Sequence, residues 1–158
     1  MNKPVSLCDL LGSDAVMAGL EATDKKQLIQ TLSRHASAQW GVEEHVLFDV
    51  LWEREKLGTT GVGQGIAIPH GRVAGLETVR GFFARLASPI DFDSVDGRPV
   101  DLVFLLLAPE SAGADHLHAL AAVSRALRNT ALCDQLRSAK DAAAINALLN
   151  KASLAEAA

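Results

Sequence analysis

The sequence predicts an α/β protein in which helices cover both faces of a sheet. Helical patterns occur before, between and after short apolar runs that are typical of strands. The run 100–108 is apolar almost throughout, as expected for a central strand that helices cover on both sides. With 158 residues and 49% hydrophobic content, the chain can form one domain around a single core. We predict this domain over residues 1–150 and a frayed tail over 151–158.

The N-terminal half is predicted to be mainly helical. Apolar residues up to about Ala22 recur with no clear periodicity, and we expect an irregular arm there. A helix begins at the capping residue Thr23 or Asp24 and ends near Gly41, because apolar side chains recur on one side between them. A second helix begins at about Glu43 and has its own apolar stripe.

Strands and further helices are predicted in the second half. Residues 66–68 form a short strand that ends at Pro69, which has no backbone N–H to continue a ladder. A strand over 79–87 is followed by a connection over 89–99, with a turn at Asp96–Gly97, and then by the central strand. The remaining three helices are predicted over 115–128, 130–139 and 141–150.

Composition and charge exclude several classes of protein. The net charge of −4 and the aromatic content of 4% argue against a nucleic-acid partner, which needs basic surface and stacking rings. Cys8 and Cys133 suggest neither a disulfide framework nor a metal motif. The start of the chain lacks the apolar core of a signal peptide, and the longest apolar run, 102–108, is too short for a bilayer. These features favour a cytoplasmic domain without direct membrane insertion.

The segment from Gly58 to His70 has the clearest functional signal. Its glycines allow backbone N–H groups to approach a small ligand, and its threonine hydroxyls add donors and acceptors. The glycine spacing fits neither the Walker pattern nor the dinucleotide fingerprint, which argues against a nucleotide site. Two interpretations remain: a phosphoryl group on the imidazole with the loop as its cradle, or a plain surface turn. The candidate cradle residues are Thr59, Thr60, Gly61, Gly63 and Gly65.

Arg54 continues the apolar stripe of the second helix and is therefore expected to point inward near its C-terminal end. A buried guanidinium needs a partner, since an unpaired charge in the interior is costly. It either complements the helix dipole and pairs with Glu53 or Glu55, or is directed at the glycine loop to receive a phosphoryl group. We expect Glu53, Glu55 and Lys56 to form a solvated surface.

His116 and His118 lie two positions apart in a predicted helix, so their side chains diverge by about 200°. His116 falls on the core-facing arc, and His118 points to solvent. The two rings cannot bind one metal from a regular helix, and no metal site is predicted. The helix N-terminus favours a neutral His116, which is either a partner for another ring or a packed core histidine. His35 and His45 are expected to be structural or exposed.

Three blocks of the sequence together resemble the enzyme IIA domains of the bacterial phosphoenolpyruvate-dependent phosphotransferase system. The blocks are Arg54-Glu55-Lys56, the glycine-rich segment from Thr59 to Gly71, and Asp115-His116-Leu117. The resemblance extends from Val5 to about Leu149. It is to the mannitol/fructose class, and most of all to the free-standing nitrogen-regulatory member of that class.

The resemblance implies a phosphoryl carrier built on a mixed parallel and antiparallel, five-stranded sheet with helices on both faces. His70 is then the residue phosphorylated, through Nε2, by a small histidine phosphocarrier protein. His116 would assist the transfer beside it, and Arg54 would help to hold the phosphoryl oxygens. Such a site works by positioning and charge stabilisation, so no cofactor and no metal are expected.

The sequence leaves three functions open. The first is a nitrogen-regulatory enzyme IIA whose phosphorylation state controls its binding to target proteins. The second is a sugar-specific enzyme IIA for fructose or mannitol that serves a separate enzyme IIB. The third is a non-catalytic module that binds a phosphate ligand and leaves His70 unmodified. The similarity of residues 51–56 and of the histidine block to the nitrogen-regulatory branch favours the first.

Overall fold

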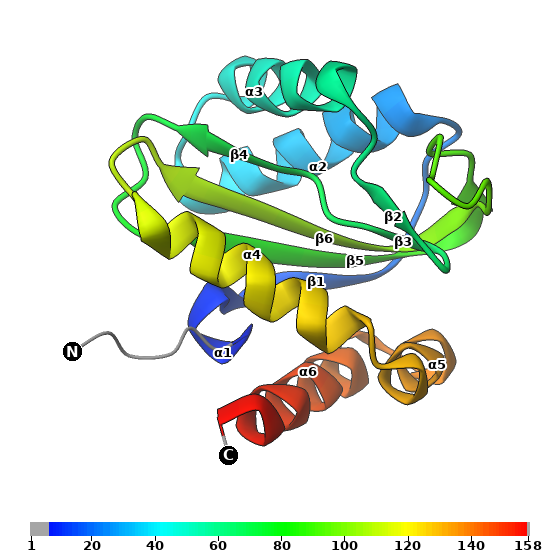
Figure 1. The fold of residues 1–158 in the computed structure, drawn as a ribbon. Helices are drawn as coiled ribbons and strands as arrows, with labels where there is room; N and C mark the ends of the chain where they lie inside the picture. The colour runs from blue at the N-terminus through cyan, green and yellow to red at the C-terminus, as the bar shows by residue number, and fades with distance from the viewer. Residues whose placement is uncertain (1–6, 158) are drawn as a thin grey trace.

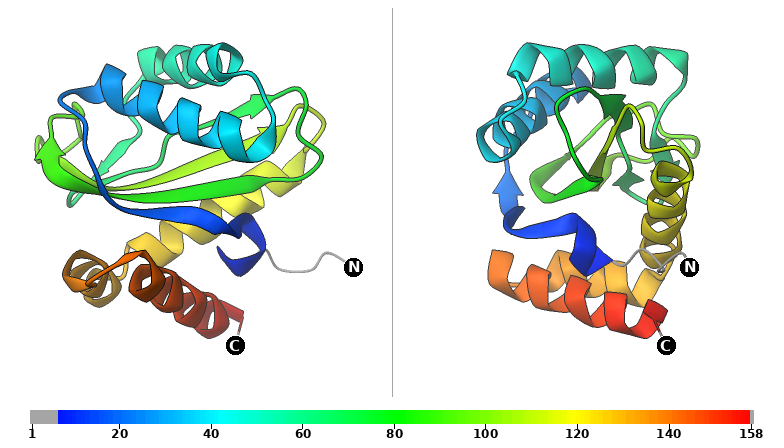
Figure 2. Two further views of the ribbon diagram at one scale, coloured as in Figure 1. Left: turned by 180° about the vertical axis from the view of Figure 1, so that it is seen from behind. Right: turned by 90° about the vertical axis from the view of Figure 1, so that its left-hand side faces the viewer.

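The computed structural model describes residues 7–157. The helices are α1 (Leu7–Leu10), α2 (Lys25–Trp40), α3 (Glu44–Leu57), α4 (Ala114–Leu127), α5 (Thr130–Ser138) and α6 (Ala142–Ala157). The strands are β1 (Leu11–Leu20), β2 (Gly61–Gly63), β3 (Ile66–Ala67), β4 (His70–Val73), β5 (Arg80–Ile90) and β6 (Val100–Pro109). The sheet forms the middle of three layers, with α2 and α3 over one face and the other helices over the opposite face (Figures 1 and 2). The predicted α/β architecture is confirmed.

The sheet has six strands, where five were predicted. Its order is β1-β5-β6-β3-β2, and β4 pairs with β6 outside this path. Strands β3 and β4 use successive stretches of one edge of β6, since Ile66 pairs with Leu102 and His70 pairs with Leu106. Pro69 lies between them and cannot donate to the ladder. The strand predicted over 66–68 is therefore β3, which ends before Pro69, and β4 is a further strand that begins at His70.

Strand β1 was not predicted, and β5 extends beyond its predicted bounds. The expected irregular arm before Ala22 is instead the short helix α1 and the strand β1, which pairs parallel to β5. Side chains of β1 alternate between the two faces, with Met17 packed on one side and Val16 and Ala18 on the other. Glycines interrupt this alternation in the sequence and hide the strand signal. Strand β5 continues through Pro89 to Ile90.

The core lies on both faces of the sheet, as the apolar run 100–108 predicted. Alternate residues of β6 enter the two clusters: Val103, Leu105 and Leu107 pack beneath α2 and α3. Leu102, Phe104 and Leu106 pack against α4, α5 and α6. A central strand of this kind fixes the positions of the strands on either side of it.

The helix boundaries follow local capping chemistry. The Asp24 side chain accepts a hydrogen bond from Gln27 N at 2.8 Å, and Gly41 ends α2 with a φ of 72°. At the C-terminus, α6 continues from Asn150 to Ala157, so the backbone over 151–157 is helical. Within the described residues, no helix combines the length and apolar character needed to cross a bilayer.

Candidate functional site

His70 lies at the break between β3 and β4, on the edge of β6. The Pro69 carbonyl just before it accepts a hydrogen bond from Leu106 N at 2.9 Å. On the other side, helix α3 passes so close that a Cβ on Gly71 would lie 2.5 Å from Val50 Cγ1. The backbone on both sides of His70 is therefore held firmly, while its ring is only half-buried.

The His70 ring has a defined orientation. Its Nδ1 lies 2.8 Å from the carbonyl oxygen of Ile68. Because a carbonyl only accepts, Nδ1 must carry the proton and donate in this bond. In the neutral ring, Nε2 is then the nitrogen with a free lone pair, and it is the one able to act as a nucleophile.

His116 lies beside His70, in the first turn of α4. The ring centroids are 5.7 Å apart and the planes are tilted by 43°. His116 is buried, and its Nδ1 has no hydrogen-bond partner among the described residues. His118 is exposed, as predicted from its helical phase. The structure thus brings together two of the predicted site residues that are far apart in the sequence.

Both rings of the site favour the neutral state. Burial is the main cause of the lowered pKa of His70; the Arg54 charge acts in the same direction, whereas the Ile68 bond and Glu55 oppose it. Burial also lowers the pKa of His116, with further contributions from His70 and Arg72. A neutral imidazole is the form that can attack phosphorus.

Two arginines stand close enough to act on these rings. Arg54 is half-buried instead of pointing inward, and its Nη1 donates to the carbonyl of Gly58 at 3.0 Å. Gly58 is both the C-cap of α3 and the first residue of the glycine-rich segment, so this bond is compatible with both interpretations of Arg54. Arg72 was not predicted as a site residue, because it belongs to no recognisable motif. It donates from Nη2 to Gly113 O at 3.2 Å and so links β4 to the start of α4.

Glu55 is buried, although a solvated position was predicted for it. It follows Leu47 and Leu51 at intervals of four, so it takes the core-facing position expected for Arg54. Its carboxylate accepts bonds from Thr60 N and Thr60 Oγ1, and it pairs with Lys25 Nζ at 2.9 Å. The four-residue spacing was the sequence signal for this buried acid.

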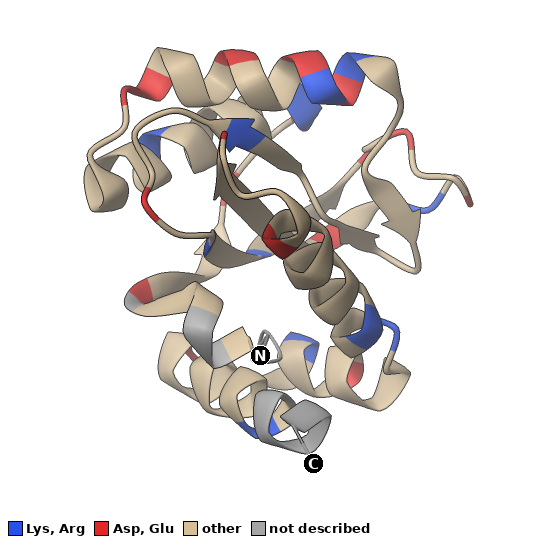
Figure 3. Ribbon diagram, turned by 60° about the vertical axis from the view of Figure 1, so that its left-hand side comes forward, with Lys and Arg blue, Asp and Glu red and all other residues tan. Residues whose placement is uncertain are grey.

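Glu53 and Lys56 are exposed and pair with each other at 2.6 Å, as expected for a solvated surface. Figure 3 shows charged residues of both signs along α3. Helix α4 has only Asp115 and Arg125 as its acidic and basic residues. The site therefore lies between a highly charged helix and one with few charges.

The two threonines of the glycine-rich segment use their hydroxyls within the protein. Thr59 Oγ1 donates to Phe92 O at 2.8 Å and accepts from Gly61 N at 3.0 Å. Thr60 is buried, and its hydroxyl donates to Glu55. Because Thr60 O accepts from Ile68 N at 3.0 Å, this part of the hairpin does lie near His70. Both threonine hydroxyls therefore donate to other groups of the protein, and the threonines stabilise the backbone near His70.

The predicted cradle glycines lie progressively farther from His70. Gly61 pairs with Ala67, and Gly63 pairs with Ile66. Gly65 is at the turn of the β2–β3 hairpin, roughly 15 Å from His70 at about 3.3 Å per strand residue. A Cβ on Gly65 would lie 2.6 Å from Arg137 Nη2. The structure therefore does not gather all of the predicted loop residues around His70.

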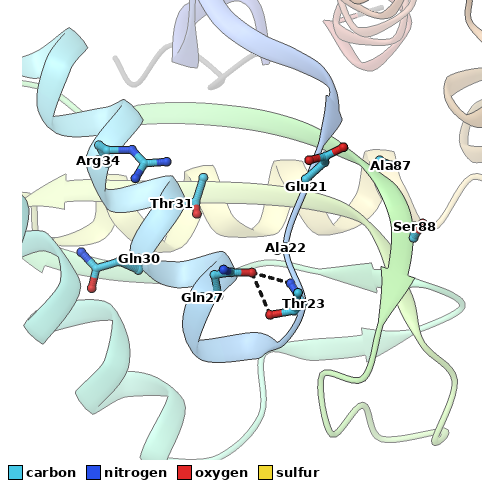
Figure 4. Close-up of a pocket in the computed structure, with 9 residues that line it drawn as sticks. All are labelled: Glu21, Ala22, Thr23, Gln27, Gln30, Thr31, Arg34, Ala87 and Ser88. Atoms are coloured by element: carbon cyan, nitrogen blue, oxygen red, sulfur yellow. Dashed lines mark hydrogen bonds between the residues drawn. The ribbon is translucent and has the colours of Figure 1, made fainter.

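His35, His45 and a surface depression on α2 lie away from His70. His35 stacks on Phe82 with centroids 6.1 Å apart, and exposed His45 is 3.3 Å from Glu43. A depression between α2 and the ends of β1 and β5, which includes Thr23 and Gln27, is at the opposite edge of the sheet from β3 and β4 (Figure 4). Among the residues whose side chains the structure describes, no group of three or more His, Cys, Asp or Glu could hold a metal ion.

Comparison with known families identifies the class of protein. The family described as "Phosphoenolpyruvate-dependent sugar phosphotransferase system, EIIA 2" matches residues 9–152. The chain belongs to this family, which confirms the resemblance seen in its sequence.

Within this class, the chain is similar to nitrogen regulatory proteins. It is 52% identical over 143 residues to that of Bradyrhizobium diazoefficiens, covering 90% of this chain and 94% of the relative. It is 37% identical over 138 residues to that of Escherichia coli K12, covering 86% and 84%. The crystal structure of nitrogen regulatory protein IIA-Ntr from Neisseria meningitidis has a TM-score of 0.84 and 35% identity, covering 89% and 97%.

Proposed function

We propose that this chain is a nitrogen-regulatory phosphoryl carrier that accepts a phosphoryl group on Nε2 of His70. The proposal rests on the 2.8 Å bond from Nδ1 to Ile68 O, which leaves the Nε2 lone pair for reaction. Family membership and the similarity to nitrogen regulatory proteins support the same assignment. The protein would act in the cytoplasm, with a histidine phosphocarrier protein as its donor.

The transfer exchanges one phosphorus–nitrogen bond for another. Nε2 of His70 attacks the phosphorus of the donor's phosphohistidine in line; its bond to phosphorus forms as the bond to the donor nitrogen breaks. The electron pair of the broken bond stays on the donor nitrogen, and the donor ring leaves as a neutral imidazole with the proton on its other nitrogen, while His70 keeps its Nδ1 proton. No proton transfer or further reactant is required, so the site contributes positioning and charge stabilisation.

Arg54 and His116 would stabilise the charge that spreads over the phosphoryl oxygens. The Arg54 guanidinium has donors in addition to the one that bonds to Gly58 O. His116 has a buried Nδ1 without a partner in the described part of the chain, and a protonated ring nitrogen can donate to a phosphoryl oxygen. These contacts would hold the group without a metal clamp, so that it can be passed on.

Exposed apolar side chains beside the site favour a protein as the donor. Leu117 follows His116 and is 61% exposed, and Leu57 lies within one turn of Arg54 and is 85% exposed. Exposed apolar side chains that are close in sequence to Arg54 and His116 are available for contact with a protein. We propose that the phosphocarrier protein, and an enzyme IIB or a regulated target, dock on this surface.

Phosphorylation would also control partner binding through charge. A phosphoryl group adds about −1.5 to −2 charges to the surface of a chain whose net charge is already −4. Partners that contact the His70 surface should therefore distinguish the two forms. The difference in affinity should shrink as salt concentration rises, because exposed charges are screened.

Phosphotransfer followed by mass spectrometry tests the proposal. The purified chain is mixed with enzyme I, the phosphocarrier protein and phosphoenolpyruvate, and its mass is compared with reactions that lack one component. We expect the gain of a single acid-labile, base-stable phosphoryl group, and no gain for His70→Ala. A gain that persists in His70→Ala would assign the group to another residue. No gain in the wild type would favour a non-catalytic phosphate-binding module.

A further inference from the structure

Glu55 is a buried acid that the proposed transfer does not yet use. Its side chain is only 2% exposed and contacts Lys25 Nζ at 2.9 Å. Both Thr60 N and Thr60 Oγ1 donate to it, with the backbone N–H at 2.9 Å from Oε2. A buried carboxylate with a cationic partner and these donors has a fixed position as well as a charge.

Lys25 is itself held in place. Its ammonium lies 4.7 Å from the centroid of Phe92 and 3.4 Å from Asp93 Oδ2. Glu55 therefore connects the start of α2, the end of α3, the β2 hairpin and the 91–99 connection. The carboxylate cannot move away from the site without breaking these contacts.

Hydrogen bonds link Glu55 to His70, because Glu55 accepts from Thr60 N, Thr60 O accepts from Ile68 N at 3.0 Å, and Ile68 O accepts from His70 Nδ1 at 2.8 Å. The charge of Glu55 also acts on the His70 ring. It raises the pKa of the ring, whereas the neighbouring Arg54 lowers it. Two consecutive residues of α3 thus place opposite charges within electrostatic range of one imidazole. A phosphoryl group on that imidazole would be attracted by the guanidinium and repelled by the carboxylate.

We propose that Glu55 is a positioning residue that keeps the phosphoryl group on His70 transferable, by placing a fixed negative charge beside it. This inference rests on the proposed phosphorylation of His70. Arg54 alone would favour retention of the dianionic group, and repulsion from Glu55 offsets part of that attraction. The balance between these two charges would therefore contribute to the equilibrium of phosphoryl exchange with the donor.

The phosphoryl-exchange equilibrium with the phosphocarrier protein tests this role. Wild type and Glu55→Gln are each equilibrated with the phosphorylated donor, and the four species are quantified by intact mass. We expect Glu55→Gln to shift the equilibrium towards the phosphorylated chain by about fivefold, because the amide removes the repulsion. Its His70 ring should also titrate at lower pH by NMR, a change that a merely structural role would not produce.

Two controls separate charge from stability. Glu53→Gln removes one negative charge from the same helix at an exposed side chain, and Ile145→Ala opens the buried core under α6, away from the site. Both should leave the equilibrium within twofold of wild type. An unchanged equilibrium and an unchanged His70 titration in folded Glu55→Gln would overturn the proposal.

The double variant Lys25→Met with Glu55→Gln covers the case in which Glu55→Gln does not fold. It leaves no unpaired buried charge, and it should shift the equilibrium in the same direction, because Arg54 and Glu55 supply the charges that act on His70. No shift in the folded double variant would equally overturn the proposal. A wild-type chain that takes up no phosphoryl group on His70 would instead refute the proposed function itself.

Discussion

The β2–β3 hairpin within the segment from Gly58 to His70 has two ends with opposite properties, the open end next to His70 and the turn at Gly65. At the His70 end, the ring is half-buried and the nearby His116 has a buried nitrogen without a partner among the described residues. At the hairpin turn, Gly65 O accepts from Asp101 N at 3.0 Å, and Arg137 pairs with Asp101 at 2.8 Å. One sequence block thus contains a reactive end and a packed end.

This difference shows that glycine content alone does not mark a phosphate cradle. A Cβ on Gly61 would lie 2.4 Å from Ser94 Oγ, and one on Gly65 would lie 2.9 Å from Asp101 Oδ1. These glycines let the hairpin pack closely against other segments. The reactive site is instead indicated by polar groups that still have unused hydrogen-bonding capacity, and these groups lie at the His70 end of the hairpin.

The largest expected effect is at the reactive end. Arg54→Gln should slow phosphorylation of the chain by about 100-fold, because it removes a charge directed at the developing negative oxygens. Rapid-quench measurement of phosphotransfer checks this. Arg34→Gln is the matched control, since Arg34 is an exposed arginine on α2, and it should transfer at the wild-type rate. Equal rates for both variants would remove Arg54 from the site.

At the packed end, Gly65→Ala should affect stability instead of transfer. The new Cβ would crowd the pair formed by Arg137 and Asp101, and Gly65 has a φ of +82°, so we expect a loss of about 2 kcal/mol in urea unfolding. Gly97→Ala also has a positive φ but meets nothing within 4 Å, and it should cost about 1 kcal/mol. If folded Gly65→Ala accepted the phosphoryl group far more slowly than wild type, Gly65 would have a role in the phosphoryl site after all.

Much of this difference between the two ends of the hairpin could not be predicted from the sequence. The helices, the central strand and the core-facing phase of His116 follow from periodicity and capping, which are local. The spacing of Glu55 from Leu51 indicated its burial, but its pairing with Lys25 and the packing of Gly65 against Arg137 did not follow from local patterns. Partners so distant in the chain are brought together only by the tertiary fold. Strand β1 was missed because its alternation is broken by glycines and because it depends on pairing with β5.

A smaller effect should appear in the pH dependence of stability. Burial lowers the pKa values of His70 and His116 below 6.5, so the unfolded chain binds protons that the folded chain does not. The contribution of these two histidines to the free energy of unfolding is complete above pH 6.5 and is lost as the pH falls below 6.5. We expect a lower free energy of unfolding at about pH 5.5 than at about pH 7.5, with a smaller difference for His116→Gln. If the difference in free energy of unfolding between the two pH values is the same for wild type and His116→Gln, groups other than His116 control the pH dependence of stability.

The position of the phosphoryl group on the His70 ring tests the central claim most directly. The chain is labelled with ¹⁵N at histidine, phosphorylated by the donor proteins, and studied by long-range ¹H–¹⁵N correlation. We predict phosphorus on Nε2 of His70, with the proton retained on Nδ1 towards Ile68 O. Phosphorus on Nδ1, or on any other histidine, would contradict the account.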